Sequence, residues 1–160
     1  MISASTSRSA VGLAVPDFAI PGTGGHFTLS GRLGQAVVIY FYPKDNTPGC
    51  TTEAMQFRDL HAEFIAAGAS IFGVSRDSIK SHEGFRSKLG LPFELLSDTD
   101  GTICRLFDVI KIKNMYGKQV PGIERSTFLI DATGILRAEW RKLQADGHAA
   151  EVLAAVRELS

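Results

Sequence analysis

Two different hydrophobic patterns follow each other along this chain. The stretch Ala36–Tyr42 is apolar on both faces and rich in β-branched and aromatic residues, which is typical of a central strand covered on both sides. Residues 50–67 instead repeat apolar side chains every three or four positions, which predicts a helix that ends at Gly68. The residues expected on the packed face of this helix are Cys50, Ala54, Phe57, His61 and Phe64.

The remaining elements alternate between strand and helix before a late hairpin. Short alternating pieces on either side of a Gly-rich turn at residues 21–25 predict an N-terminal hairpin. We further expect strands at 70–75, 93–96, 127–131 and 135–141, helices at 77–89, 101–107 and 147–159, and an irregular segment at 108–124. This order predicts an α/β three-layer sandwich with a central mixed β-sheet, which fits a thioredoxin-like fold. A flavodoxin-like doubly wound sheet is the competing architecture, and the late hairpin argues against it.

Length and charge limit the classes of protein to which this chain can belong. A chain of 160 residues suits one domain with a sizeable core, which we expect to span residues 11–160 after a flexible arm at 1–10. The 17 basic and 17 acidic residues balance, so no global field draws in nucleic acid or an anionic membrane. No apolar run approaches the roughly 18 residues of a membrane span, and the first ten residues lack the apolar core of a secretory signal.

Cysteine and histidine usage favours a reducing location and no metal. Two cysteines, Cys50 and Cys104, are too few for a disulfide scaffold, which favours a cytoplasmic protein, although they still allow a transient catalytic disulfide. The four histidines are scattered without the spacing of metal ligands, so we expect no metal site.

Cys50 stands where a stiff loop meets the start of the predicted helix. Pro43 and Pro48 each fix a backbone dihedral, and Gly49 leaves the backbone beside the sulfur open to a small molecule. A thiol in the first turn of a helix feels the partial positive charge and free N–H groups there, which favours the reactive thiolate. A cysteine on a packed helix face is ordinarily a small buried apolar residue, and the composition of this loop favours a nucleophile instead.

Several segments in one order resemble a known enzyme family. Pro43, Thr47 and Cys50 match the peroxiredoxin motif P-x-x-x-T-x-x-C. More specifically, the chain resembles the PrxQ branch, also called bacterioferritin comigratory protein, from Gly12 to the C-terminal helix. The segments that carry this resemblance are 40–54, 57–59, 95–98, 115–118 and 122–131. It implies a thiol-dependent peroxidase that needs no cofactor.

The same resemblance implies how the loop acts. Cys50 would be the peroxidatic nucleophile, whose thiolate attacks one oxygen of a hydroperoxide and becomes a sulfenic acid. Pro43 would shield the sulfur, and the N–H groups of Gly49 and Cys50 would hold the peroxide together with Thr47. The Thr47 hydroxyl is further expected to donate a hydrogen bond to the sulfur.

Two charged residues complete the implied site. Arg125 would lie beside the sulfur, stabilise the thiolate and polarise the peroxide, and Glu53 would orient that guanidinium through a bidentate pair. Their ordinary alternatives are a solvated arginine at a strand edge and a first-turn glutamate placed for the helix dipole.

The chain departs from many PrxQ-like relatives at Met55, five residues after Cys50, where those relatives carry a second cysteine. Cys104 is then the remaining intramolecular candidate, and its apolar neighbours Ile103 and Phe107 favour a buried structural thiol. We therefore expect a monomeric one-cysteine enzyme that is reduced by an external thiol such as thioredoxin or glutaredoxin. A two-cysteine enzyme in which Cys104 resolves Cys50 is the alternative.

Two other classes compete with a peroxidase. A thioredoxin-like disulfide oxidoreductase needs a second cysteine three residues after the first, and that position is Glu53. A non-enzymatic binding module of the same fold has no need for the set of Pro43, Thr47, Cys50 and Arg125. The predicted function is therefore a peroxidase acting on hydrogen peroxide and small organic hydroperoxides.

Overall fold

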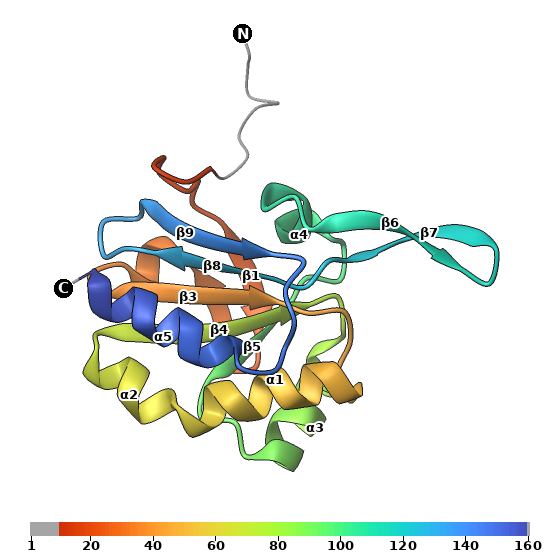
Figure 1. Cartoon of the computed structure of the whole chain (residues 1–160), viewed down its shortest axis with the longest axis horizontal. Helices are drawn as coiled ribbons and strands as arrows, with labels where there is room; N and C mark the ends of the chain where they lie inside the picture. The colour runs from red at the N-terminus through yellow and green to blue at the C-terminus, as the bar shows by residue number, and fades with distance from the viewer. Residues whose placement is uncertain (1–9, 160) are drawn as a thin grey trace, which may run out of the picture.

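The computed structural model describes residues 10–159 and arranges them around a seven-stranded sheet, with a two-stranded sheet beside it (Figure 1). Residues 1–9 of the expected N-terminal arm lie outside the described residues. Within the described part, no helix is long and apolar enough to cross a bilayer. The strands are β1 (Ala19–Gly22), β2 (Gly25–Thr28), β3 (Ala36–Phe41), β4 (Ala69–Ser75), β5 (Glu94–Ser97), β6 (Ile110–Met115), β7 (Lys118–Ile123), β8 (Ser126–Ile130) and β9 (Leu136–Arg141). The helices are η2 (Ser30–Arg32), α1 (Pro48–Asp59), α2 (His61–Ala66), α3 (Ile79–Leu89), α4 (Thr102–Leu106) and α5 (His148–Glu158).

β3 lies in the middle of the seven-stranded sheet, whose order is β2-β1-β5-β4-β3-β8-β9. It pairs in parallel with β4, which pairs in parallel with β5, and it pairs antiparallel with β8 on its other side. All of β3 is buried, as its apolar pattern on both faces predicts. The antiparallel pairs β1–β2 and β8–β9 confirm the expected N-terminal and late hairpins, and the sheet is mixed as predicted.

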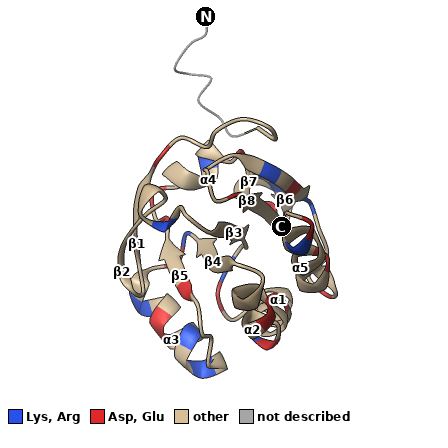
Figure 2. Cartoon of the chain, turned by 90° about the vertical axis from the view of Figure 1, so that its left-hand side faces the viewer, with Lys and Arg blue, Asp and Glu red and all other residues tan. Residues whose placement is uncertain are grey.

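Two apolar cores lie on opposite faces of this sheet. Successive side chains of β3 alternate, so Tyr40 faces a core closed by α1, α2, α3 and α5, whereas Ile39 faces a core closed by α4 and the N-terminal segment. Figures 1 and 2 show α1, α2 and α5 on one side of β3 and α4 on the other. The expected three layers are therefore present, and Cys50 and Cys104 belong to different cores.

The helix predicted at residues 50–67 is in fact two helices, and the first begins earlier. α1 starts at Pro48, where a missing N–H costs little because first-turn N–H groups have no intrahelical acceptor. The backbone leaves the helical region at Leu60 (φ −99°, ψ 2°), which separates α1 from α2. The packed face is as predicted for Cys50, Ala54, Phe57 and Phe64, which are buried, while His61 is only half-buried.

The irregular segment predicted at 108–124 is wrong, because residues 110–123 form the regular hairpin β6–β7. Its two-residue turn consists of Tyr116 (φ 53°) and Gly117 (φ 79°), a positive-φ pair that suits the twist of a tight hairpin. Pro121 suggested a break in the strand, but a two-stranded sheet has open edges at which a missing N–H is tolerated. Figure 1 shows this hairpin projecting from the body of the molecule.

Candidate active site

Cys50 is the third residue of α1, at the carboxyl end of the central strand. β3 ends at Phe41, and Pro48 occupies the first position of the helix. The N–H groups of Gly49 and Cys50 therefore lie in the first turn, where the helix offers them no acceptor. The Cys50 residue itself is only 1% exposed, so its sulfur lies just beneath the protein surface. This position places a thiol and two N–H groups that have no helical acceptor at the edge of the sheet where active sites of α/β folds lie.

Arg125 lies directly against the sulfur. Its Nη2 donates to Cys50 Sγ at 3.3 Å, and its Nη1 donates to Glu53 Oε1 at 2.7 Å. The sheet explains this proximity, since Arg125 precedes the first residue of β8, Ser126, and Ser126 pairs with Phe41 at the end of β3. The arginine side chain is 16% exposed, so it is neither the solvated strand-edge residue considered above nor fully enclosed.

Glu53 is a buried carboxyl that shares the guanidinium with the sulfur. It follows Cys50 by nearly one helical turn, its side chain is 1% exposed, and its Oε2 has no hydrogen-bond partner. Burial raises the pKa of Glu53 to about 7, although the charge and hydrogen bond of Arg125 act in the opposite direction. Burial also acts to lower the pKa of Arg125, but the negative groups Glu53 and Cys50 outweigh it and raise that pKa. The contact is a single short hydrogen bond rather than the bidentate pair expected from the sequence.

The loop residues of the motif that precede Cys50 are partly exposed. Pro43, Thr47 and Gly49 are all half-buried. A side chain at Gly49 would place its Cβ only 3.0 Å from Arg125 Nη2, so the absence of a side chain there leaves room for the guanidinium. The expected donation from Thr47 to the sulfur is wrong, because its hydroxyl donates to the carbonyl oxygen of Lys44 at 2.8 Å. Its oxygen lone pairs remain available as acceptors.

Cys104 lies on the opposite side of the sheet from Cys50. It lies on α4, is fully buried, and belongs to the core on the opposite face of the sheet from Cys50. Its N–H donates to Asp98 Oδ2 at 2.7 Å. Burial, followed by the hydrogen bond and charge of Asp98, raises the pKa of the Cys104 thiol well above its ordinary value. These surroundings favour a neutral structural thiol.

Comparison with known proteins agrees with this geometry. The model of the AhpC/TSA family matches residues 11–139, and the Peroxiredoxin Bcp of Xanthomonas campestris is 59% identical over 130 residues, which are 81% of each chain. The chain belongs to the peroxiredoxins of the AhpC/TSA family. It is an enzyme, a thiol peroxidase of the PrxQ/Bcp group, as its sequence motifs predict.

Solved peroxiredoxin structures share the fold. A PrxQ structure from Xylella fastidiosa superimposes with a TM-score of 0.90 at 44% identity, covering 96% of this chain and 98% of that one. A structure of the Xanthomonas campestris bacterioferritin comigratory protein, described by its alkyl peroxide reduction activity, gives a TM-score of 0.85 at 55% identity over 89% of this chain and 91% of that chain. The predicted thioredoxin-like fold is therefore confirmed.

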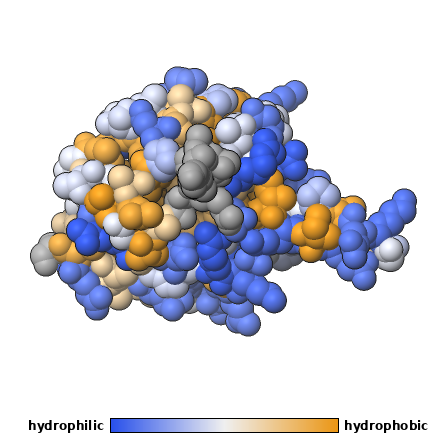
Figure 3. Space-filling model, turned by 90° about the horizontal axis from the view of Figure 1, so that it is seen from above, coloured by the Kyte–Doolittle hydropathy of each residue, from blue (hydrophilic) through white to orange (hydrophobic). Residues whose placement is uncertain are grey.

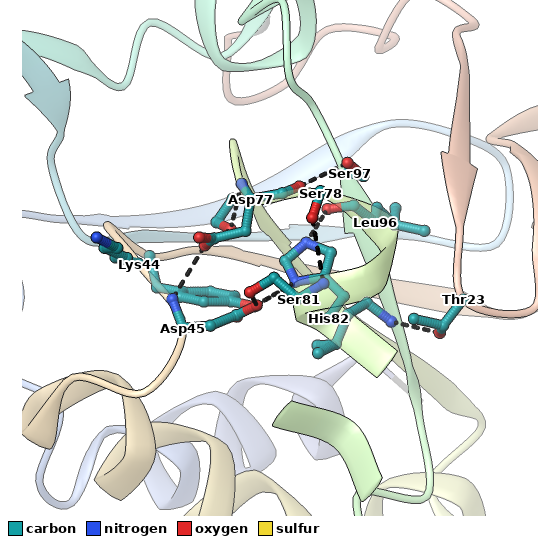
Figure 4. A network of polar contacts seen from close by, with 12 residues as sticks. Thr23, Lys44, Asp45, Asp77, Ser78, Ser81, His82, Leu96 and Ser97 are labelled. Atoms are coloured by element: carbon teal, nitrogen blue, oxygen red, sulfur yellow. Dashed lines mark hydrogen bonds and ion pairs between the residues drawn. The ribbon is translucent and has the colours of Figure 1, made fainter. Parts of the chain in front are cut away.

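In this peroxiredoxin, Asp45 anchors the loop that precedes Cys50. Its buried carboxylate accepts hydrogen bonds from Tyr42 Oη at 2.6 Å, Ser81 Oγ at 2.8 Å and His82 Nδ1 at 2.8 Å (Figure 4). Its N–H donates to Asp77 Oδ2 at 2.9 Å. Burial alone would raise the pKa of Asp45, but these side-chain hydrogen bonds, led by His82, hold it below its ordinary value. Sequence reasoning missed this residue; its signal was an acidic side chain between the two prolines of the loop.

His82 completes the anchor from α3. Its Nδ1 lies 2.8 Å from Asp45 Oδ2, and its Nε2 lies 2.9 Å from the carbonyl oxygen of Leu96, so each ring nitrogen faces an oxygen acceptor. Among the described residues, Asp45, Asp77 and His82 form the one group whose potential ligand atoms lie within 4.8 Å of one another. Both ring nitrogens of His82 are already engaged by protein oxygens, so hydrogen bonding accounts for this cluster. The expectation of no metal site stays a prediction.

Proposed function

We propose that the enzyme reduces hydrogen peroxide and small organic hydroperoxides through a sulfenic acid on Cys50. The observation that carries this proposal is the 3.3 Å contact between Arg125 Nη2 and Cys50 Sγ. A fixed cation at that distance orients the sulfur through a hydrogen bond, and it also faces the charge that develops on the leaving oxygen. The alkyl peroxide reduction activity named for the Xanthomonas protein supports organic hydroperoxides as substrates.

The chemical step exchanges one weak bond for a stronger one. The Cys50 thiolate attacks the terminal oxygen of ROOH, an S–O bond forms as the O–O bond breaks, and the sulfur loses two electrons. The leaving RO⁻ takes up a proton from solvent and becomes an alcohol, or water when R is hydrogen. The guanidinium of Arg125 and the free N–H groups of Gly49 and Cys50 serve as preorganised donors to the two oxygens. The Thr47 oxygen accepts from the hydroperoxide O–H, since its own proton is directed to Lys44.

A one-cysteine cycle fits this chain better than an internal disulfide. Cys104 lies in the opposite core, so a bond to Cys50 requires one of the two cores to open. The position five residues after Cys50 is Met55. Two solved structures of the Xanthomonas PrxQ carry cysteine-to-serine exchanges 36 residues apart, and 36 residues after Cys50 this chain has Arg86. No cysteine therefore stands at either interval.

Regeneration then depends on an external thiol. A dithiol attacks the sulfenic acid, releases water and forms a mixed disulfide with Cys50; its second thiol then displaces Cys50 as thiolate and leaves as a disulfide. Thioredoxin and glutaredoxin are proteins of this chemistry. A reducing compartment such as the cytoplasm supplies dithiol reductants of this kind, and the two free cysteines of this chain are in keeping with such a location. We also propose a monomer, because Cys50, Glu53 and Arg125 all come from one chain.

Peroxide consumption with dithiothreitol tests the assignment. The parent protein and Cys104→Ser are expected to turn over at similar rates, whereas Cys50→Ser is expected to lose activity. If Cys50→Ser consumes peroxide as fast as the parent, the proposed chemistry is wrong. If Cys104→Ser alone loses turnover while the parent is active, the one-cysteine cycle is wrong and Cys104 resolves the sulfenic acid.

A further inference from the structure

The hairpin β6–β7 carries a concentration of exposed apolar side chains. Among the described residues eight large apolar side chains are exposed, and three of them fall within positions 112–116. Ile112 is 65% exposed, Met115 is 51% exposed and Tyr116 is 100% exposed. Figure 3 shows apolar side chains on the projecting arm beside hydrophilic ones. Apolar side chains gathered on one projecting element are typical of an interaction site.

The same hairpin is basic in a chain whose net charge is zero, although one of its lysines, Lys111, pairs with Asp108 at 3.4 Å. Residues 109–123 contain three lysines and no acidic residue. The register of the two strands places three of the residue pairs on one face of the hairpin. These pairs are 111/122, 113/120 and 115/118. That face therefore combines Lys111, Lys113 and Lys118 with Met115 and Val120. A surface of this composition complements an acidic protein surface that has an apolar centre.

Tyr116 has a backbone conformation that is unfavourable for a tyrosine. At φ 53° it is in the left-handed region, where a bulky L-residue is an outlier and Asn is the usual first residue of such a turn. A tyrosine that is 100% exposed gains no packing in return. The backbone cost of this residue is therefore not offset within the chain. Such a residue suits an anchor that is buried only when a partner binds.

The base of the hairpin is fixed beside the reactive centre. β7 ends at Ile123, two residues before Arg125, whose guanidinium contacts Cys50. The base is held by Glu124 N–H, which donates to the Val109 carbonyl at 2.7 Å, and by Lys113 Nζ, which donates to the Ile123 carbonyl at 2.8 Å. Figure 1 shows the hairpin projecting from the same end of the sheet at which α1 begins. A protein that binds along the hairpin toward its base is therefore brought to the end of the molecule at which Cys50 lies.

We propose that the β6–β7 hairpin is the docking surface for the protein dithiol that reduces Cys50, and that this dithiol presents carboxylates around its reactive cysteine. The inference rests on the proposed function, which requires an external thiol. A reductant has to bring its sulfur to Cys50, and the hairpin offers a cationic, apolar and projecting contact at that place. Lysines alone would also suit an anionic membrane, but the aromatic and thioether side chains and the position beside Arg125 favour a protein partner.

The turn itself supplies a sharp test of this proposal. Tyr116→Asn keeps a turn residue that the left-handed conformation favours, so the variant is expected to unfold at the same temperature as the parent or higher. It removes the aromatic anchor, and the efficiency kcat/KM for an acidic thioredoxin, supplied with its reductase and NADPH, is expected to fall about tenfold. Lys118→Glu is expected to lower the same efficiency, with a loss that shrinks at high salt. Lys88→Glu, an exposed lysine in the last turn of α3, is the matched control and should behave as the parent.

Turnover with dithiothreitol separates docking from chemistry. Unchanged dithiothreitol rates in Tyr116→Asn and Lys118→Glu, together with lower thioredoxin efficiency, support the proposal. The proposal is wrong if all variants have the same kcat/KM with thioredoxin, or if the hairpin variants lose equal activity with both reductants. It is also wrong if dithiothreitol reduces the parent protein but thioredoxin does not. If the hairpin variants convert a dimer to a monomer in sedimentation, a second copy occupies the surface and the proposal is wrong. A parent that is inactive even with dithiothreitol would instead contradict the proposed function.

Discussion

Replacing Glu53 by glutamine changes how the stability of this protein depends on pH. The carboxyl is 1% exposed, one of its oxygens bonds Arg125 Nη1 at 2.7 Å and the other has no partner. Its pKa is raised from the ordinary value of 4.5 to about 7, chiefly because burial disfavours the charged form. The folded protein therefore binds this proton more tightly than the unfolded chain. Glutamine keeps the size and an acceptor oxygen for the arginine but cannot titrate.

The size of the effect follows from the two pKa values. A group whose pKa is raised on folding contributes stability that is fully present below the unfolded pKa and is lost as the pH rises through the folded pKa. For Glu53 the contribution is present below pH 4.5 and disappears as the pH passes 7. Between pH 8 and pH 5 this group should raise the free energy of unfolding by about 2 to 3 kcal/mol.

Urea unfolding at pH 5 and pH 8 measures this contribution. The gain in stability on going from pH 8 to pH 5 should be smaller in Glu53→Gln than in the parent by about 2 to 3 kcal/mol. Glu63→Gln, at a side chain that is 51% exposed, is the matched control and should track the parent. If Glu53→Gln shows the same pH dependence as the parent, the raised pKa of the buried carboxyl is wrong.

Three further substitutions test the geometry of the site. Gly49→Ala places a methyl group 3.0 Å from Arg125 Nη2, so the second-order rate with peroxide, measured by competition with catalase, should fall about tenfold or more while circular dichroism stays unchanged. Arg125→Lys cannot contact the sulfur and Glu53 together, and stopped-flow oxidation should slow by about 100-fold; an unchanged rate would show that the second contact is dispensable. Asp45→Asn weakens a buried acceptor of three side-chain hydrogen bonds and should lower the free energy of unfolding by about 3 kcal/mol or more, and a much smaller loss in thermal unfolding would argue that this carboxylate does not anchor the loop.

Much of the fold could be predicted because burial determines it. The stretch Ala36–Phe41 is apolar on both faces and becomes the central strand, and the three- and four-residue repeat of α1 places Cys50 on the packed face. The hairpin β6–β7 was missed because it has no buried face to impose a pattern, so lysines stand where a core strand has apolar residues. The start of α3 was placed two residues early, since it depends on the Ser78 hydroxyl, which caps the Ser81 N–H.

Some residues of the site could be predicted from the local sequence, whereas others depend on contacts between distant segments. Cys50 and its helix start are local in sequence, and so is the loop of Pro43, Thr47 and Gly49. The contact of Arg125 with the sulfur depends on the pairing of β8 with β3, for which the resemblance to peroxiredoxins was the guide. The support that Asp45 receives from His82 joins residues 37 positions apart on different elements. A periodic pattern in the sequence cannot predict such a pair, because contacts between distant elements occur at no fixed sequence separation.

The central claim is that the Cys50 thiolate itself takes one oxygen from a peroxide. The most direct measurement mixes one equivalent of hydrogen peroxide with the reduced protein in a stopped-flow instrument and analyses the quenched product by intact mass and peptide mapping. We predict rapid consumption of the peroxide, one added oxygen atom on the peptide that contains Cys50, and a free thiol at Cys104. Oxygen on Cys104, a disulfide between Cys50 and Cys104, or peroxide left unconsumed would contradict this account.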